Sequence, residues 1–190
     1  SEMCIRDSPW GIGFLSNALD NDYWKSKSLE TDYSRIKIPV MLWSGWADCY
    51  PTAILRAYSK FKVPKKVFIG PWGHGTMRLR TTSLGNVDFG EEAMCGYPSH
   101  HELRKRWFDR WLQDEPNGVE NESPVEIFVM GGGSGEKNDE GFMDHGGSWR
   151  QESEWPIART RLQTMYLTPD GALSDRSLKE SDSTSYIHNP

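Results

Sequence analysis

The stretch Ile38-Pro39-Val40-Met41-Leu42-Trp43 is a compact run of apolar residues and predicts a buried strand. Ser44–Pro51 (SGWADCYP) follows with residues typical of a turn, and Thr52–Phe61 places apolar residues at helical spacing. Lys65–Gly70 (KKVFIG) is then typical of a second short strand. A strand, a helix and a strand in such close succession indicate a parallel crossover unit, so we expect a sheet of the α/β kind.

The pattern changes further along the chain. Ser99–Gln113 predicts another helix, because Ser99 and Glu102 have the spacing of a capping box. Its apolar stripe is formed by Leu103, Trp107, Phe108, Trp111 and Leu112. Val125–Met130 and then Arg161–Leu167 instead alternate as strands do, and the turn residues Thr168–Gly171 (TPDG) suit a hairpin. Residues from about 119 onward therefore predict an antiparallel sandwich that forms a separate layer.

We expect three segments, with boundaries at 1–8, 9–118 and 119–190. The first holds Met3-Cys4-Ile5-Arg6-Asp7-Ser8, which looks like the in-frame translation of a sequencing adapter, and we exclude it from fold reasoning. A natural N-terminal extension is the alternative. If the adapter interpretation holds, the genuine protein enters at about Pro9 within a longer reading frame, and the chain is expected to be a fragment.

Composition excludes several classes of protein. Hydrophobic residues make up 36% of the 190 residues and charged residues 26%, a balance typical of a globular protein. The net charge is −5 and the basic residues are scattered, which argues against nucleic acid and anionic membrane as partners. No apolar run approaches the roughly 20 residues that span a bilayer. Three cysteines are too few and too unpatterned for a disulfide scaffold.

Two side chains follow the predicted parallel strands at the edge where α/β sheets place their sites. Asp48 lies five residues past the first apolar run, and His74 lies five past Ile69. An acid followed by a histidine fits the last two members of the Ser/acid/His order of α/β-hydrolases. The alternative is that Asp48 only caps the helix and His74 is a solvated loop residue. If the catalytic interpretation holds, their side chains should lie about 2.6 to 3.2 Å apart.

Four ordered motifs carry a resemblance: Trp43–Asp48 (WSGWAD), Ile69–Gly75 (IGPWGHG), Asp88–Gly90 (DFG) and Arg106–Leu112 (RWFDRWL). With them the chain resembles the X-Pro dipeptidyl-peptidase and cocaine-esterase-like family of serine hydrolases. The resemblance implies that Asp48 and His74 are the acid and the histidine of a catalytic triad. It also implies that 9–118 is the C-terminal part of an α/β-hydrolase sheet.

Later segments are similar to the start of that family's C-terminal jelly-roll domain: Pro124–Gly131 (PVEIFVMG), Trp149-Arg150, Trp155-Pro156 and Tyr166–Ser174 (YLTPDGALS). The resemblance implies an incomplete antiparallel β-sandwich (jelly roll) over 119–190, because about eight strands complete such a domain.

The nucleophile of the family lies in a Gly-x-Ser-x-Gly elbow before the acid, and no such sequence occurs in the 190 residues. Ser44 and Ser99 are not substitutes, because neither lies in an elbow. We therefore expect the nucleophile and the oxyanion donors to lie upstream, and the chain alone to be inactive.

Other patterns predict neither a cofactor nor a metal site. Gly131–Lys137 lacks the Gly-Lys-Ser/Thr spacing of a phosphate loop, and His100-His101-Glu102 lacks the second histidine of a zinc protease. The acidic loop at 139–145 could bind a cation, although a solvated loop is the simpler interpretation. Cys49 is interpreted as a small packing residue.

Two function classes remain open. The first is a serine hydrolase of acyl esters or peptides, with a small-molecule ester or peptide as substrate and with X-Pro dipeptides, amino-acid esters, acylated β-lactams and aryl esters all compatible. The second is a non-catalytic sandwich that binds carbohydrate or protein on an α/β scaffold. A Gly-x-Ser-x-Gly elbow in the upstream sequence would favour the first class.

Overall fold

The computed structural model describes residues 9–75, 81–94 and 99–177, together with Ser183, Ser185 and Ile187. Residues 1–8, which the sequence interpretation sets aside, lie outside the described part. The chain divides into two compact units, Ser1–Pro156 and Ile157–Pro190, and each is described by itself.

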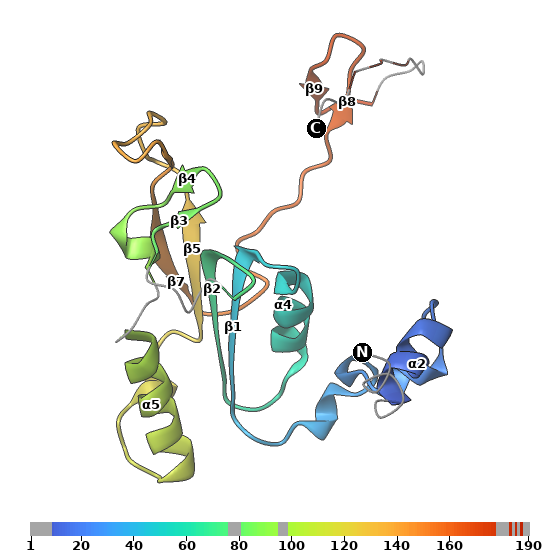
Figure 1. The fold of residues 1–190 in the computed structure, drawn as a ribbon, viewed down its shortest axis with the longest axis vertical. Helices are drawn as coiled ribbons and strands as arrows, with labels where there is room; N and C mark the ends of the chain where they lie inside the picture. Colours follow the sequence, from blue (N-terminus) through green and yellow to red (C-terminus); the bar gives the residue numbers. More distant parts are fainter. Residues whose placement is uncertain are drawn as a thin grey trace. The chain divides into compact units, whose positions relative to one another are not determined.

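The first unit is built on a four-stranded mixed sheet (Figure 1). Its strands follow the spatial order β1 (Val40–Ala47), β2 (Lys65–Gly73), β5 (Val125–Met130) and β7 (Gly147–Glu152). β1 and β5 both run parallel to β2, whereas β7 is antiparallel to β5. The helix α4 (Pro51–Lys60) connects β1 to β2, so the predicted crossover unit is confirmed.

Both parallel strands run further toward their carboxyl ends than the sequence predicts. The segment 44–47, expected as a turn, continues β1 through a bulge, and Ala47 pairs with Gly73. Gly45 makes this possible, since a Cβ at that position would lie 1.9 Å from the carbonyl oxygen of Trp72. A residue without a side chain is required where two backbones approach this closely.

The core lies on both faces of β2 and on one face of α4. Leu55, Tyr58 and Phe61 are buried at the predicted helical spacing. The other fully or almost fully buried residues of this sheet are Val67, Phe68 and Ile69 in β2 and Val125, Ile127 and Phe128 in β5, and Phe128 clusters with Phe89 and Ala93. A strand buried on both faces is what a parallel sheet requires.

The expectation that β5 opens a separate antiparallel layer is wrong. β5 adds to the edge of β2, where the backbone N–H of Val67 donates to the carbonyl of Pro124 at 2.9 Å. Val125 and Ile127 share one buried face as the alternation predicts, but Val129 is exposed. The free hydrogen-bonding edge of β2 and the apolar start of β5 explain why this strand extends the existing sheet.

The helix α5 spans Ser99–Leu112. Trp107 is buried on its inner face, whereas Phe108 and Leu112 are exposed, so the predicted apolar stripe is too broad. The two exposed residues lie one position beyond Trp107 and Trp111, about 100° further around the helix. The side chain of Ser99 lies outside the described part, as does the capping box that depends on it.

Shorter elements complete the first unit. They are α2 (Pro9–Ser16), α3 (Asp22–Lys25), β3 (Ser83–Leu84), β4 (Val87–Asp88) and β6 (Met143–Asp144), with single turns of 3-10 helix at Leu29–Thr31, Tyr33–Arg35, Glu91–Ala93 and Val119–Asn121. β3, β4 and β6 form a small second sheet.

The second unit contains one described hairpin, β8 (Tyr166–Leu167) with β9 (Leu173–Ser174). Its turn is the predicted Thr168–Gly171, in which the N–H of Gly171 donates to the carbonyl of Thr168 at 3.0 Å. The strand expected over 161–167 is formed only at its end, and the described residues do not form a jelly roll. Within the described residues, no helix has both the length and the apolar character needed to cross a membrane.

Candidate active site

Asp48 lies in the short turn between β1 and α4. Its backbone N–H donates to the carbonyl of Gly45 at 3.0 Å, and Pro51 begins the helix three residues later. The carboxylate is tucked under this turn, with 5% of the side chain exposed. The tight connection therefore holds the acid in one position.

His74 follows the last residue of β2 and precedes Gly75, whose φ of 78° lies in the left-handed region that favours glycine. The imidazole projects from this turn with 69% of its side chain exposed. Because β1 and β2 are parallel neighbours, their carboxyl ends bring Asp48 and His74 to the same edge of the sheet.

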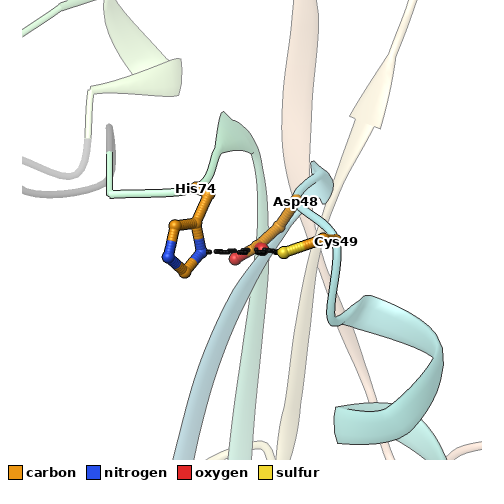
Figure 2. Close-up of side chains that lie close together, drawn as sticks. All are labelled: Asp48, Cys49 and His74. Carbon is orange, nitrogen blue, oxygen red and sulfur yellow. Dashed lines mark hydrogen bonds and ion pairs between the residues drawn. The ribbon is translucent and has the colours of Figure 1, made fainter. Parts of the chain in front are cut away.

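The two side chains meet at this edge. Nδ1 of His74 lies 3.0 Å from Oδ1 of Asp48, within the range that the sequence predicts. Figure 2 shows that the second ring nitrogen, Nε2, faces away from Asp48. One nitrogen is therefore engaged by the carboxylate while the other is directed away from it.

Asp48 has further partners besides the histidine. Its Oδ1 accepts from the backbone N–H of Tyr50 and from the Cys49 thiol, each at 3.3 Å. Ser44, which is fully buried, places its hydroxyl 3.4 Å from Oδ2. Burial would raise the pKa of Asp48, but hydrogen bonds from the Cys49 thiol, the His74 ring and the backbone N–H groups outweigh it and hold that pKa below its usual range.

A cleft of about 650 Å³ lies beside the pair, and both Asp48 and His74 contribute to its wall. Most of the remaining lining is apolar and comes from Leu29, Tyr33, Leu42, Trp43, Ile54 and Phe61. Tyr50, which also lines the cleft, holds its ring edge-on to the imidazole with the centroids 5.4 Å apart. The pair thus borders an apolar space large enough for a small organic group.

Cys49 is the residue that the sequence interpretation misjudged. It was expected to be a packing residue, yet its side chain is exposed and its thiol joins the carboxylate of Asp48. The extended β1 and the sharp turn after it rotate Cys49 outward. Its position beside the predicted acid was the available sequence signal.

The other candidates from the sequence do not join this group. Ser44 is enclosed behind Asp48, and Ser99 lies at the start of α5. In the glycine-rich loop, the N–H and hydroxyl of Ser134 both donate to Asp144, a contact that closes the loop on itself. Among the described residues, the sole group of three potential metal-ligating side chains with ligand atoms within 4.8 Å of one another is Asp48, Cys49 and His74.

Two family models match the chain. One, described as X-Pro dipeptidyl-peptidase (S15 family), matches residues 5–76. The other, described as X-Pro dipeptidyl-peptidase C-terminal non-catalytic domain, matches residues 117–190. Together they cover more than half of the chain.

Individual proteins agree with these matches. Cocaine esterase from Rhodococcus sp. (strain MB1 Bresler) is 29% identical over 169 residues, covering 86% of this chain and 26% of that protein. Among solved structures, a CocE/NonD family hydrolase from Staphylococcus aureus has a TM-score of 0.61 at 16% identity, covering 85% of this chain and 25% of that one. An aminopeptidase from a marine sediment archaeon of the Thaumarchaeota has a TM-score of 0.56 at 17% identity, covering 82% and 24%.

The structural matches show the shared fold, and the chain spans about a quarter of the length of these relatives. The two models match in the order that the motifs predict, with the peptidase match first and the C-terminal match second. The chain therefore belongs to the X-Pro dipeptidyl-peptidase S15 family, which includes the CocE/NonD hydrolases, and it carries the end of the catalytic domain and the C-terminal non-catalytic domain.

Proposed function

We propose that this chain supplies the acid and the histidine of a serine hydrolase that cleaves acyl esters or peptides through an acyl-enzyme. The observation that carries the proposal is the 3.0 Å contact between Nδ1 of His74 and Oδ1 of Asp48 at the carboxyl edge of two parallel strands. In such a relay the carboxylate fixes the histidine tautomer and stabilises the imidazolium that forms. The nucleophilic serine would come from a segment outside these 190 residues.

The proposed reaction has two halves. In the first, Nε2 of His74 accepts the serine hydroxyl proton while the serine oxygen attacks the substrate carbonyl, and the resulting tetrahedral oxyanion collapses. The leaving alcohol or amine takes the proton from Nε2. In the second half, Nε2 takes a proton from water, hydroxide attacks the acyl-enzyme, and the serine recovers the proton as the acid product leaves. Asp48 remains ionised throughout, in keeping with its lowered pKa.

The cleft beside the pair indicates the kind of substrate. Its wall is mainly apolar, with Leu29, Leu42 and Ile54 among the lining residues. An apolar acyl or leaving group would be removed from water there. Glu30 also lines the wall but is already paired with Arg56, so a charged substrate group would have to compete with that ion pair. We therefore favour uncharged esters and peptides with an apolar side chain next to the scissile bond.

The second part of the chain, over 119–190, is proposed to begin the family's jelly-roll domain, with β5 as the strand that joins this part to the α/β sheet. The family model at residues 117–190 and the β8–β9 hairpin support this assignment. In this proposal the domain takes no part in the proton transfers.

The experiment compares p-nitrophenyl ester hydrolysis by the 190-residue chain and by a longer protein that joins it to a nucleophile-bearing segment. The chain alone should show no turnover above background, because it has no serine elbow. In the longer protein, His74→Ala should lower kcat by about 10⁴-fold or more. His101→Ala, at an exposed histidine of α5, is the matched control and should retain activity.

A second measurement needs no turnover. Nitrogen-15 NMR of the imidazole in the 190-residue chain should show the proton of neutral His74 on Nδ1, and Asp48→Asn should shift the population toward Nε2–H. Full activity of His74→Ala would exclude the assignment, and so would an unchanged tautomer in Asp48→Asn.

A further inference from the structure

Three different metal-ligating atoms converge at the edge of the sheet. Sγ of Cys49 lies 3.3 Å from Oδ1 of Asp48 and 4.0 Å from Nδ1 of His74, and the carboxylate and imidazole atoms are 3.0 Å apart. Figure 2 shows the thiol, the carboxylate and the ring nitrogen directed toward one another from two separate turns. The proposed relay needs only the carboxylate and the imidazole, so the thiol of Cys49 is an additional member of this sulfur–oxygen–nitrogen triangle.

The triangle has the dimensions of a tetrahedral zinc site. Zinc bonds of about 2.3 Å to sulfur and 2.0 to 2.2 Å to nitrogen and oxygen place the ligand atoms of a tetrahedron about 3.4 to 3.6 Å apart. The three observed separations, 3.0, 3.3 and 4.0 Å, lie on both sides of this range. Adjustments of about half an ångström, within reach of side-chain rotation, would complete the geometry.

The ligand set and its surroundings also suit a thiophilic divalent cation. A thiolate, an imidazole and a carboxylate are ligands that zinc accepts, and three protein ligands with a fourth open position are typical of accessible zinc sites. Cys49 is exposed, and 69% of the His74 side chain is exposed, so an ion can reach the cluster and retain a water ligand.

We propose that Asp48, Cys49 and His74 bind one thiophilic divalent cation such as Zn²⁺, and that this ion switches off the histidine as a base. On binding, the Cys49 thiol proton leaves to solvent and the cation occupies Nδ1 of His74. The single proton of the neutral ring must then reside on Nε2, which becomes a donor and cannot accept the serine proton. The inhibitory half of this inference rests on the proposed function, whereas the binding half does not.

Binding is tested with the 190-residue chain alone, freed of metal and kept reduced. Titration with Zn²⁺ against a chromophoric chelator should show one equivalent bound, and Co²⁺ should give a thiolate charge-transfer band in the near ultraviolet. Cys49→Ser should remove the band and lower the zinc affinity by about 100-fold. The matched control is Cys4→Ser with Cys95→Ser, which keeps Cys49 and should keep both signals.

Absence of stoichiometric binding, or a band that survives in Cys49→Ser, would overturn the site. Inhibition is tested separately in the longer protein, where Zn²⁺ should abolish ester hydrolysis, a chelator should restore it, and Cys49→Ser should be about 100-fold less sensitive. Equal inhibition of both proteins would overturn the switch. Failure of the proposed function is distinguishable, because it would appear as full metal-free activity in His74→Ala.

Discussion

The two ends of β2 place a basic side chain beside carboxylates in opposite environments. At the amino end, Lys66 is 1% exposed, and its ammonium lies 2.9 Å from Glu122 and 3.1 Å from Glu126. At the carboxyl end, His74 has 69% of its side chain exposed and contacts Asp48 through one nitrogen. The same strand therefore carries a closed ionic cluster and an open acid–histidine pair.

The two basic groups differ in how many of their polar atoms are engaged by carboxylates. Lys66 is enclosed between two carboxylates, and Arg106 of α5 adds a further ion pair to Glu122, so this cluster links β2, β5 and α5. His74 has one ring nitrogen directed away from its partner. A buried, saturated cluster favours a structural role, whereas a histidine held at one nitrogen and open at the other can move a proton.

The largest expected effect is a loss of activity when the carboxylate at the carboxyl end of β2 is altered but not when one at the amino end is altered. In the longer protein, Asp48→Asn should lower kcat by about 10⁴-fold, since the tautomer and the imidazolium lose their support. Glu122→Gln also removes one negative charge, but it should leave kcat within about twofold and lower the free energy of unfolding by about 1 to 3 kcal/mol. Ester hydrolysis and urea unfolding measure the two quantities. Equal loss of activity in both variants would contradict the division.

A backbone contact provides the next test. Gly45→Ala should destabilise the chain by more than about 3 kcal/mol, because the new Cβ would lie 1.9 Å from the carbonyl of Trp72, a backbone atom that cannot rotate away. Gly75→Ala, where no atom lies within 4 Å, should cost less and reflect only the left-handed backbone. Thermal unfolding of both variants measures the difference, and equal losses would show that β1 and β2 can separate near Gly45.

A third test removes the ammonium group of Lys66 from its ion pairs with Glu122 and Glu126 at the amino end of β2. Lys66→Met keeps the volume of the side chain but leaves Glu126 without its ammonium partner, and should cost about 2 to 4 kcal/mol. The loss should fall below the upper values for buried pairs because the Glu122 and Glu126 side chains are 30% and 20% exposed. Lys60→Met, at an exposed lysine of α4, is the control and should cost much less, because substitutions at exposed sites without such contacts change stability little. Urea unfolding that gives equal values for both would remove the special role of Lys66.

Local sequence patterns predicted the features of this molecule that depend on interactions between residues close together in the sequence or on neighbouring strands. The α4 helix and the meeting of Asp48 with His74 follow from apolar spacing and from the geometry of parallel strands. The placement of β5 did not follow, because alternation in Val125–Met130 identifies a strand but not which edge it joins. The burial of Lys66 was equally invisible, since its partners Glu122 and Glu126 lie more than 50 residues away.

The exposed cysteine was missed for a related reason. A small apolar residue beside a turn is usually buried, and only the extension of β1 through the bulge at Gly45 determines that Cys49 faces outward. Sequence alone indicated the acid and the histidine, whereas the third member of the cluster required the three-dimensional turn.

Low pH should reduce the stability that the ion pairs of Glu122 with Lys66 and Arg106 contribute to the fold. Burial opposes ionisation of Glu122, yet hydrogen bonds from Lys66 and Arg106 lower its pKa in the folded chain. A lowered folded pKa means that the unfolded state binds more protons, so this stabilisation is complete above the ordinary value of about 4.3 and is lost as pH falls through the folded pKa.

Urea unfolding of the wild-type chain and of Glu122→Gln at several pH values measures this contribution. The difference in stability between them should shrink as pH falls below about 4.3, and by less than the full Lys66→Met loss. Asp48 also has a lowered pKa, but it is present in both proteins and cancels in the difference. A difference that grows with acid would reverse the assignment.

The smallest expected effect concerns Ser44, a buried residue of β1 whose hydroxyl lies next to Asp48 of the acid–histidine pair. Its hydroxyl lies 3.4 Å from Oδ2 of Asp48, at the long end of the hydrogen-bond range, while Oδ1 keeps its contacts to Cys49, Tyr50 and His74. Ser44→Ala removes one weak donor worth about 0.5 to 1 kcal/mol, so kcat in the longer protein should fall by less than about tenfold.

KM should not change in Ser44→Ala, because Ser44 is fully buried and cannot contact a substrate. Measuring kcat and KM separately shows which role Ser44 has. A rise in KM at constant kcat would mean that Ser44 shapes the cleft through β1, and a loss of kcat beyond about 10³-fold would mean that the single contact to Oδ2 orients the carboxylate. A modest fall in kcat alone would show that the turn itself, through its backbone and the His74 contact, positions the acid.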